Sequence, residues 1–346
     1  MSPDNVKRDI RELGFEELKK LMEEMGEKSF RAKQIYDWLH VKCADGFDEM
    51  SDISLALRQK LSEKYDASLP RAEMIQTSKL DGTKKYLFAL RDGQLIEAVK
   101  MEYHHGVSVC ISTQVGCRMG CAFCASTLGG LVRNLSRAEM LSEIYAITRL
   151  EGKRISNIVM MGIGEPLDNY EEAVAFLHMV SDEKGMNISP RNITISTCGL
   201  VPGIIRLAEE KLPVTLALSL HAASDEKRKK IMPVANSYSI AQLMEAVDIY
   251  FEKTGRRISF EYALIKGEND SDADAELLAG LAGKRRAHVN LIPVNPVTER
   301  GLKQPEDALV RAFLKKLQDK NVTATVRREL GRDIDGACGQ LRRKSL

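Results

Sequence analysis

The chain has 346 residues, of which 44% are hydrophobic and 29% charged, and its formal net charge is +2. This is the composition of a globular protein of one or two domains. No apolar run approaches the roughly 20 residues that a membrane span needs, and the start MSPDNVKRDI is too polar for a signal peptide, so we expect a cytoplasmic protein without a membrane partner.

Apolar residues recur at helical spacing in the first part of the chain. FEELKKLMEEM and FRAKQIYDWLH place them at i, i+3, i+4 and i+7, and SLALRQKLSEKY continues the pattern. Residues 1–75 are therefore predicted to form a small helical accessory domain. Residues 76–106 are predicted to be a hairpin-like connection, with strands at KKYLFAL and LIEAVKMEY and a turn at Arg91–Gly93.

Short apolar runs alternate with amphipathic helices over residues 107–320. Six runs are strand candidates, namely VSVCISTQV, ISNIVMMG, NITISTCG, VTLALSLH, RISFEYALI and HVNLIPV. Strands that alternate with helices imply parallel β/α units, and a partial or full β/α barrel fits better than an open sheet. In such a barrel the chemistry lies at the carboxyl ends of the strands. Residues 321–346 are predicted to add a strand and a loop that carries Cys338.

Three basic clusters occur along the chain, at residues 227–230, 327–328 and 342–344. Each one alone predicts a solvated surface. A near-neutral total can hide a basic face, so the composition allows an RNA partner without requiring one.

Three of the seven cysteines stand close together. Cys117, Cys121 and Cys124 have the spacing C-x3-C-x2-C directly after the first barrel strand. Without a secretion signal, disulfides are not expected, and three thiolates on one loop are suited to a metal or cluster. Structural zinc normally needs four ligands, so a zinc site would require a distant fourth. Three thiolates instead leave one iron of a [4Fe–4S] cluster open, which is the prediction.

This spacing resembles that of the radical S-adenosylmethionine (SAM) superfamily. The resemblance implies that the open iron binds the amino and carboxylate groups of SAM, and that an electron from the cluster cleaves SAM to a 5′-deoxyadenosyl radical. The turn MGIGEP, after the second strand, resembles the superfamily motif in which the backbone and Glu165 hold the methionine amino group.

Nearly the whole chain resembles the RlmN family, whose members methylate carbon 2 of an adenine in 23S ribosomal RNA and, in some cases, in tRNA. The segments that carry the resemblance are FRAKQIYDWLH, LIEAV, CISTQVGCRMGCAFC, GEPLDN, SPRNITISTCGLVP, LALSLHA, HVNLIPVNP and DIDGACGQL. Two departures from the family pattern are Ala125–Thr127 after the third cluster cysteine, and Cys198 in STCGLVP.

The family resemblance implies a reaction that uses two SAM molecules per turnover. Cys338 takes a methyl group from the first. The radical from the second removes a hydrogen from that S-methyl group, and the resulting methylene adds to carbon 2. Glu97 matches the family's proton-accepting carboxylate. Cys110 then attacks Cys338 and releases the product, leaving a transient Cys110–Cys338 disulfide.

The resemblance also implies a set of cofactor and partner contacts. The SAM-binding residues would be Gly164, Glu165, Ser196, Ser219, Leu220, His221 and Asn295. The partners would be 23S rRNA, tRNA as a second substrate, and a flavodoxin-type electron donor, with the protein acting as a monomer. RNA contacts are expected on the amino-terminal domain, where Lys19, Lys20, Arg31 and Lys33 are candidates, and the target adenine must be unstacked to reach a barrel.

Three other readings remain open at this point. A Cfr-type enzyme would methylate carbon 8 of the same adenine, although GEPLDN and IPVNP favour the RlmN type. A radical SAM enzyme with another substrate would leave Cys110 and Cys338 structural. A non-catalytic RNA-binding protein with a metal site would be colourless and contain zinc.

Overall fold

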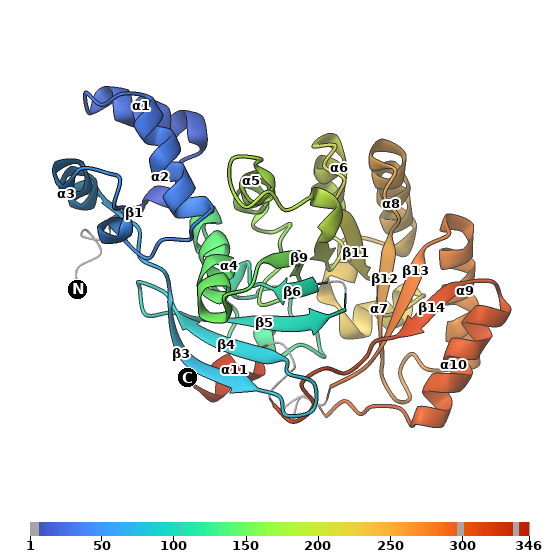
Figure 1. Ribbon diagram of the computed structural model, residues 1–346. Coiled ribbons are helices and arrows are strands. Elements are labelled where there is room, and N and C mark those ends of the chain that lie inside the picture. The colour runs from blue at the N-terminus through green and yellow to red at the C-terminus, as the bar shows by residue number, and fades with distance from the viewer. Residues whose placement is uncertain (1–6, 105, 296–300, 335–338, 346) are drawn as a thin grey trace.

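A single ten-stranded sheet runs through the molecule in the computed structural model (Figure 1). The structure describes residues 7–104, 106–295, 301–334 and 339–345. In spatial order the strands are β14 (Thr323–Val326), β13 (His288–Pro293), β12 (Ser259–Leu264), β11 (Thr215–Ser219), β10 (Ile193–Thr197), β9 (Ile155–Met160), β6 (Gly106–Cys110), β5 (Leu95–Tyr103), β4 (Lys84–Ala89) and β3 (Arg71–Thr77).

The strands from β6 to β14 are all parallel, whereas β5, β4 and β3 extend the sheet in antiparallel fashion. The six predicted barrel strands correspond to β6 and β9–β13, so the predicted partial β/α barrel is confirmed. A short hairpin of β7 (Gln114–Gly116) and β8 (Leu131–Asn134) follows β6.

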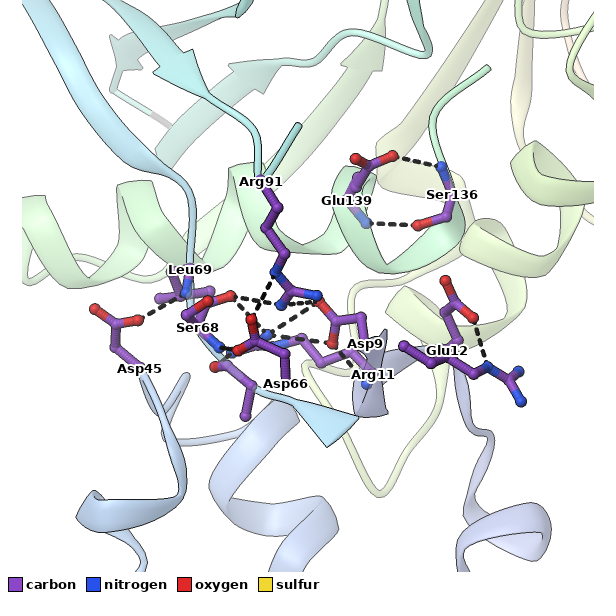
Figure 2. Close-up of polar contacts among 12 residues, drawn as sticks. Asp9, Arg11, Glu12, Asp45, Asp66, Ser68, Leu69, Arg91, Ser136 and Glu139 are labelled. Atoms are coloured by element: carbon purple, nitrogen blue, oxygen red, sulfur yellow. Dashed lines mark hydrogen bonds and ion pairs between the residues drawn. The ribbon is translucent and has the colours of Figure 1, made fainter. Parts of the chain in front are cut away.

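The connecting helices cover the outer side of the parallel strands (Figure 1). They are α4 (Arg137–Glu151), α5 (Tyr170–Ser181), α6 (Val201–Glu209), α8 (Ile240–Thr254), α9 (Asp272–Arg285) and α10 (Asp307–Asp319). Two shorter helices lie elsewhere: α7 (Asp225–Ile231) follows β11, and the carboxyl-terminal α11 (Gln340–Lys344) packs against β5. No helix within the described ranges is both long and apolar enough to cross a membrane. The start of α4 follows from its sequence, because Ser136 and Glu139 form the reciprocal bonds of a capping box (Figure 2).

The amino-terminal part has a hydrophobic core of its own. It contains β1 (Arg8–Asp9), α1 (Phe15–Glu24), α2 (Phe30–His40), α3 (Leu55–Lys64) and β2 (Tyr65–Asp66). Buried Arg11 donates to the carbonyl of Ala44 at 2.8 Å, and Arg91, from the turn after β4, binds Asp9 at 2.8 Å and Asp66 at 3.1 Å (Figure 2). Arg91 therefore ties this domain to the sheet.

A second junction joins α2 to the barrel helices. Tyr36 donates to Asp182 at 2.8 Å, and His40 Nδ1 lies 2.7 Å from the hydroxyl of Tyr145. Burial lowers the pKa of His40 to about 3, so its ring is neutral at physiological pH. The two junctions hold the amino-terminal domain against the sheet and α4.

Two expectations from the sequence need correction. The helical part ends with α3 at Lys64, and the edge strand β3 begins at Arg71, inside the range predicted to be helical. Most side chains of β3 are exposed, so it lacks the apolar alternation that would predict a strand. The basic clusters are not all solvated surface, because Arg228 and Arg342 are buried.

Glu143 on α4 provides the first testable prediction. Its side chain is buried, one carboxylate oxygen accepts the amide of Ser112 at 3.1 Å, and the other has no partner among the described residues. Burial raises the pKa of Glu143 well above its usual value, so the folded protein holds a proton that the unfolded chain releases above about pH 4.3. Its contribution to stability therefore falls as the pH rises from there towards the folded-state pKa.

We expect Glu143→Gln to stabilise the protein at pH 8, raising Tm by about 2–4 °C, with a smaller gain at pH 5. Thermal unfolding of the variant and of the exposed control Glu24→Gln at both pH values measures this. A Glu143→Gln variant less stable than the parent at pH 8 would contradict the assignment.

Candidate active site

The pairing of three neighbouring strands brings together residues from separate parts of the sequence. Lys85 on β4 and Cys110 on β6 both pair with Val99 on β5. Glu97 lies two residues before Val99, and alternate residues of a strand share a face. Lys85, Glu97 and Cys110 therefore project from the same face of the sheet.

The Glu97 carboxylate binds the carboxyl-terminal segment of the chain. Glu97 is 2% exposed and forms an ion pair of 3.0 Å with Lys85, whose side chain is fully buried. One carboxylate oxygen accepts the backbone amide of Gly339 at 2.7 Å, and the other accepts that of Arg342 at 2.6 Å. Cys338 lies outside the described residues, but its immediate neighbour Gly339 is thus fixed to Glu97.

A cavity of about 850 Å³ opens beside these residues. Its lining includes Glu97, Cys110, Gly162, Asn295 and Arg327. Burial raises the pKa of the Cys110 thiol to about 11, and the positive charge of Arg327 acts in the opposite direction. The cavity thus brings the predicted proton acceptor, a predicted thiol nucleophile and a predicted SAM contact into one space.

The loop with the three clustered cysteines is held by hydrogen bonds at several points. The amide of Cys117 donates to Gly130 at 2.9 Å, and the carbonyl of Cys124 accepts the hydroxyl of Thr127 at 2.9 Å. The amide of Ala122 donates to Ile231 of α7, also at 2.9 Å. The loop is therefore anchored to β8, to the turn after Cys124 and to α7.

The donor set of this loop fits an iron–sulfur cluster. Cys117, Cys121 and Cys124 are free thiols. Burial raises the pKa of Cys117 to about 12 and also raises that of Cys121, and the neighbouring Cys124 thiol acts in the same direction on both. In the described ranges no three His, Cys, Asp or Glu side chains converge tightly enough to hold one metal ion. A four-iron cluster does not require this, because each thiolate binds a different iron.

The turn after β9 packs closely against the chain that follows β6. A Cβ at Gly162 would lie 2.4 Å from the carbonyl oxygen of Ile111, and one at Gly164, whose φ is +114°, would lie 2.6 Å from the hydroxyl of Thr113. Only glycine fits both positions. Buried Glu165 accepts the amides of Leu167 at 3.1 Å and Cys198 at 2.7 Å, and so links the carboxyl ends of β9 and β10.

The remaining predicted SAM contacts lie at the ends of β10 and β11. The hydroxyls of Ser196 and Ser219 are 3.4 Å apart. His221, with a φ of +54°, accepts the amide of Ala263 on Nδ1 at 2.9 Å, which leaves its proton on Nε2. Its ring meets that of Phe123, from the cysteine loop, edge to face with centroids 4.5 Å apart. The cysteine loop and this strand end are therefore in direct contact, with Leu220 buried beside them.

Two buried charged residues of the site were not predicted. Lys85 is the partner of Glu97, and Glu261 on β12 accepts the Ser259 hydroxyl at 2.8 Å and the Asn290 amide nitrogen at 2.7 Å. The sequence does contain a sign of each: a charged residue stands within an otherwise apolar strand segment, KKYLFAL for Lys85 and RISFEYALI for Glu261. Such a residue is costly to bury without a partner, so its position indicates a polar network.

Comparison with known proteins identifies the family. The model described as the ribosomal RNA large subunit methyltransferase N-terminal domain matches residues 8–66, and that of the radical SAM superfamily matches residues 111–278. A protein of Lachnospira eligens named "Probable dual-specificity RNA methyltransferase RlmN" is 55% identical, over 98% of this chain and 97% of its own length. The chain belongs to the RlmN family.

Two other proteins are also similar to this chain over nearly its whole length. The RlmN protein of Clostridium perfringens is 53% identical over 98% of both chains. The crystal structure of a radical SAM methyltransferase from Sphaerobacter thermophilus has a TM-score of 0.92 and 41% identity, and covers 96% of this chain and 98% of its own. Membership of the RlmN family makes this chain a SAM-dependent methyltransferase and implies a [4Fe–4S] cluster and SAM as its cofactors. The Cfr type is not favoured.

Proposed function

We propose that the protein methylates carbon 2 of an adenine in 23S ribosomal RNA, with tRNA as a second substrate, and consumes two SAM molecules per turnover. The observation that carries the proposal is the bond between the Glu97 carboxylate and the amide of Gly339. It links the proposed proton acceptor to the residue next to the proposed methyl carrier, Cys338. The relatives' printed names, which describe dual-specificity RNA methyltransferases, support the substrate class.

Cys117, Cys121 and Cys124 would hold the cluster, and the glycine turn with Glu165 and the ends of β10 and β11 would hold SAM. When bound, these cofactors supply the one-electron cleavage that produces a carbon radical. The chain's own residues then complete the reaction. Glu97 accepts the proton lost from carbon 2 of the radical adduct, and the electron lost with this proton would return to the cluster. The Glu97 carboxylate is paired with Lys85, and the α11 amides hold it in a fixed direction.

Cys110 would release the product. Its thiolate attacks the sulfur of Cys338, so that a disulfide forms and the bond from that sulfur to the RNA-borne carbon breaks. The electron pair moves to this carbon, which takes up a proton and becomes the methyl group. A dithiol reductant of the cell then restores both cysteines.

The arginines beside the cavity favour an RNA substrate. Arg327 and Arg328 follow the carboxyl end of β14, and Arg311 lies with them along a neighbouring pocket. All three are exposed, and none forms an ion pair with a described residue. This group of cations beside the cavity suits a phosphate backbone whose extruded base enters the barrel.

We expect Arg328→Ala to weaken RNA binding and to reduce the slope of log K against log salt concentration by about 1, because one phosphate contact is lost. Binding titrations of 23S rRNA fragments at several salt concentrations measure this slope. The matched control is Arg191→Ala, an exposed arginine at the amino end of β10. Equal slopes for both variants would remove Arg328 from the RNA surface.

The direct test of the proposed function is product analysis. The protein is purified without oxygen, its cluster is reconstituted, and it is incubated with SAM, a reductant and unmodified 23S rRNA fragments, beside Cys338→Ala. We expect 2-methyladenosine from the parent and none from the variant. 8-Methyladenosine would assign the Cfr-type reaction instead, and SAM cleavage without any methylated adenosine would point to another substrate.

Three further properties belong to this proposal. A flavodoxin-type protein would donate the electron, the enzyme would act as a monomer, and it would work in the cytoplasm. A reducing compartment suits a mechanism that needs free thiols at Cys110 and Cys338.

A further inference from the structure

Arg228 is the buried charge that the proposed reaction leaves unused. It lies on α7 and is 0% exposed, whereas its neighbours Lys229 and Lys230 are exposed. Lys227, on the same helix, pairs with Asp274 at 2.7 Å. Arg228 has no such carboxylate: it forms no ion pair with any residue in the described ranges.

Among the residues that the structure describes, the guanidinium of Arg228 is bound only by backbone carbonyls. Nε donates to Leu220 at 3.1 Å, and Nη2 donates to Cys198 at 2.6 Å and to Ser219 at 3.4 Å. Nη1 is buried without a partner among the described residues. Carbonyl dipoles satisfy hydrogen bonds but do not neutralise a formal charge, and an uncompensated buried charge is strongly destabilising. Asp225 acts on this charge without forming an ion pair with it, so the site lacks an anion in contact with the guanidinium.

The surroundings of Arg228 indicate which anion would balance its charge. Arg228 is bonded to the carbonyl of Cys198, which packs in one hydrophobic cluster with Cys121, Ile231 and Met232. Ile231, at the end of the same helix, accepts the amide of Ala122 beside Cys121. Helix α7 therefore places the buried Arg228 next to the residues that pack around the cysteine loop.

A [4Fe–4S] cluster held by three thiolates has a net negative charge, and this charge grows by one unit on reduction. Its reduction potential depends on nearby charges, hydrogen bonds and exposure to solvent. A fixed cation in a dry environment stabilises the reduced state more than the oxidised state, because Coulomb interactions are strong at low dielectric constant.

We propose that Arg228 is the built-in countercharge of the iron–sulfur cluster and raises its reduction potential. It is a positioning and tuning residue that does not touch the RNA. The inference rests on the proposed function in one respect, that Cys117, Cys121 and Cys124 hold the cluster. The hydrogen bonds of Arg228 to the ends of β10 and β11 hold this charge in place and at the same time fix the strand ends that carry Ser219 and Leu220.

The test is a potentiometric titration of the reconstituted protein, followed by electron paramagnetic resonance. With Arg228→Gln we expect the ratio of reduced to oxidised cluster at a fixed potential to fall at least about tenfold, a shift of about 59 mV for a one-electron couple. Arg228→Lys, which keeps the charge, should retain most of the parent potential. Lys229→Gln, which removes an exposed charge from the same helix, should leave it unchanged.

A second substitution covers the case in which Arg228→Gln does not fold. Citrulline at position 228 replaces one terminal nitrogen by oxygen, so it removes the charge but keeps Nε and one terminal nitrogen as donors. A neutral variant with full iron content and the parent potential would overturn the proposal, as would an Arg228→Lys variant whose potential falls as far as that of the neutral ones. If the unmodified protein bound no four-iron cluster, the proposed function itself would fail instead.

Discussion

Replacing Glu97 with glutamine is expected to lower the methylation rate by about a hundredfold or more, the usual contribution of a positioned general base. The amide cannot accept the proton from carbon 2. The substitution also removes one partner of the buried ion pair with Lys85, and the loss of one partner of a buried pair costs roughly 3–5 kcal/mol of folding free energy. Moreover, one of the two amides at the start of α11 would face an NH2 group in place of an acceptor oxygen.

Single-turnover methylation of an rRNA fragment measures the first effect, and limited proteolysis of the carboxyl terminus measures the release of α11. Glu102→Gln is the matched control, because Glu102 lies on the same strand but is exposed. The double variant Lys85→Met/Glu97→Gln should recover stability without recovering activity, since it removes both charges of the buried ion pair and leaves the chemical defect in place. A Glu97→Gln enzyme within threefold of the parent rate would exclude Glu97 as the proton acceptor.

The second large effect is expected for Cys110→Ala, which should abolish turnover and accumulate protein joined covalently to RNA. Methyl transfer to Cys338 and addition to the adenine do not need Cys110, but cleavage of the sulfur–carbon bond does. Denaturing gels of reactions with labelled RNA detect the adduct, and mass spectrometry locates it. Cys43→Ala, at a buried cysteine of the amino-terminal part, is the control.

In the parent enzyme, the attack of Cys110 on Cys338 should make the rate of product release depend on pH. Because the pKa of Cys110 is raised to about 11, only a small fraction is thiolate near neutral pH. The rate of product release should therefore rise with pH towards that pKa. If Cys110→Ala turned over normally and formed no adduct, Cys110 would not be the residue that releases the product.

Periodicity and spacing in the sequence were sufficient to predict the barrel strands and the cysteine loop. The buried parallel strands are short segments rich in apolar residues, and C-x3-C-x2-C is local. The contacts that organise the site are not local. Glu97 meets Arg342 across 245 positions of sequence, and nothing near LIEAV indicates which amides its carboxylate will accept.

The errors have a similar origin. The run Lys227–Lys230 has the composition of a solvated surface, yet the turn of α7 buries Arg228 and exposes Lys229 and Lys230. Only the packing of that helix against the strand ends distinguishes them. Likewise, β3 is an exposed edge strand, and its pairing with β4 defines it more than its own residues do. The prediction for Cys338 falls outside the described residues and stays a prediction.

The contact between Glu97 and the last helix has a consequence for how the enzyme matures. A chain leaves the ribosome with its amino terminus first, and domains fold in that order. The barrel can form early, but the Glu97 carboxylate meets Gly339 and Arg342 only after this late segment of the chain has been translated. A prematurely terminated chain would fold and yet be inactive. For the same reason an affinity tag belongs at the amino terminus, away from α11.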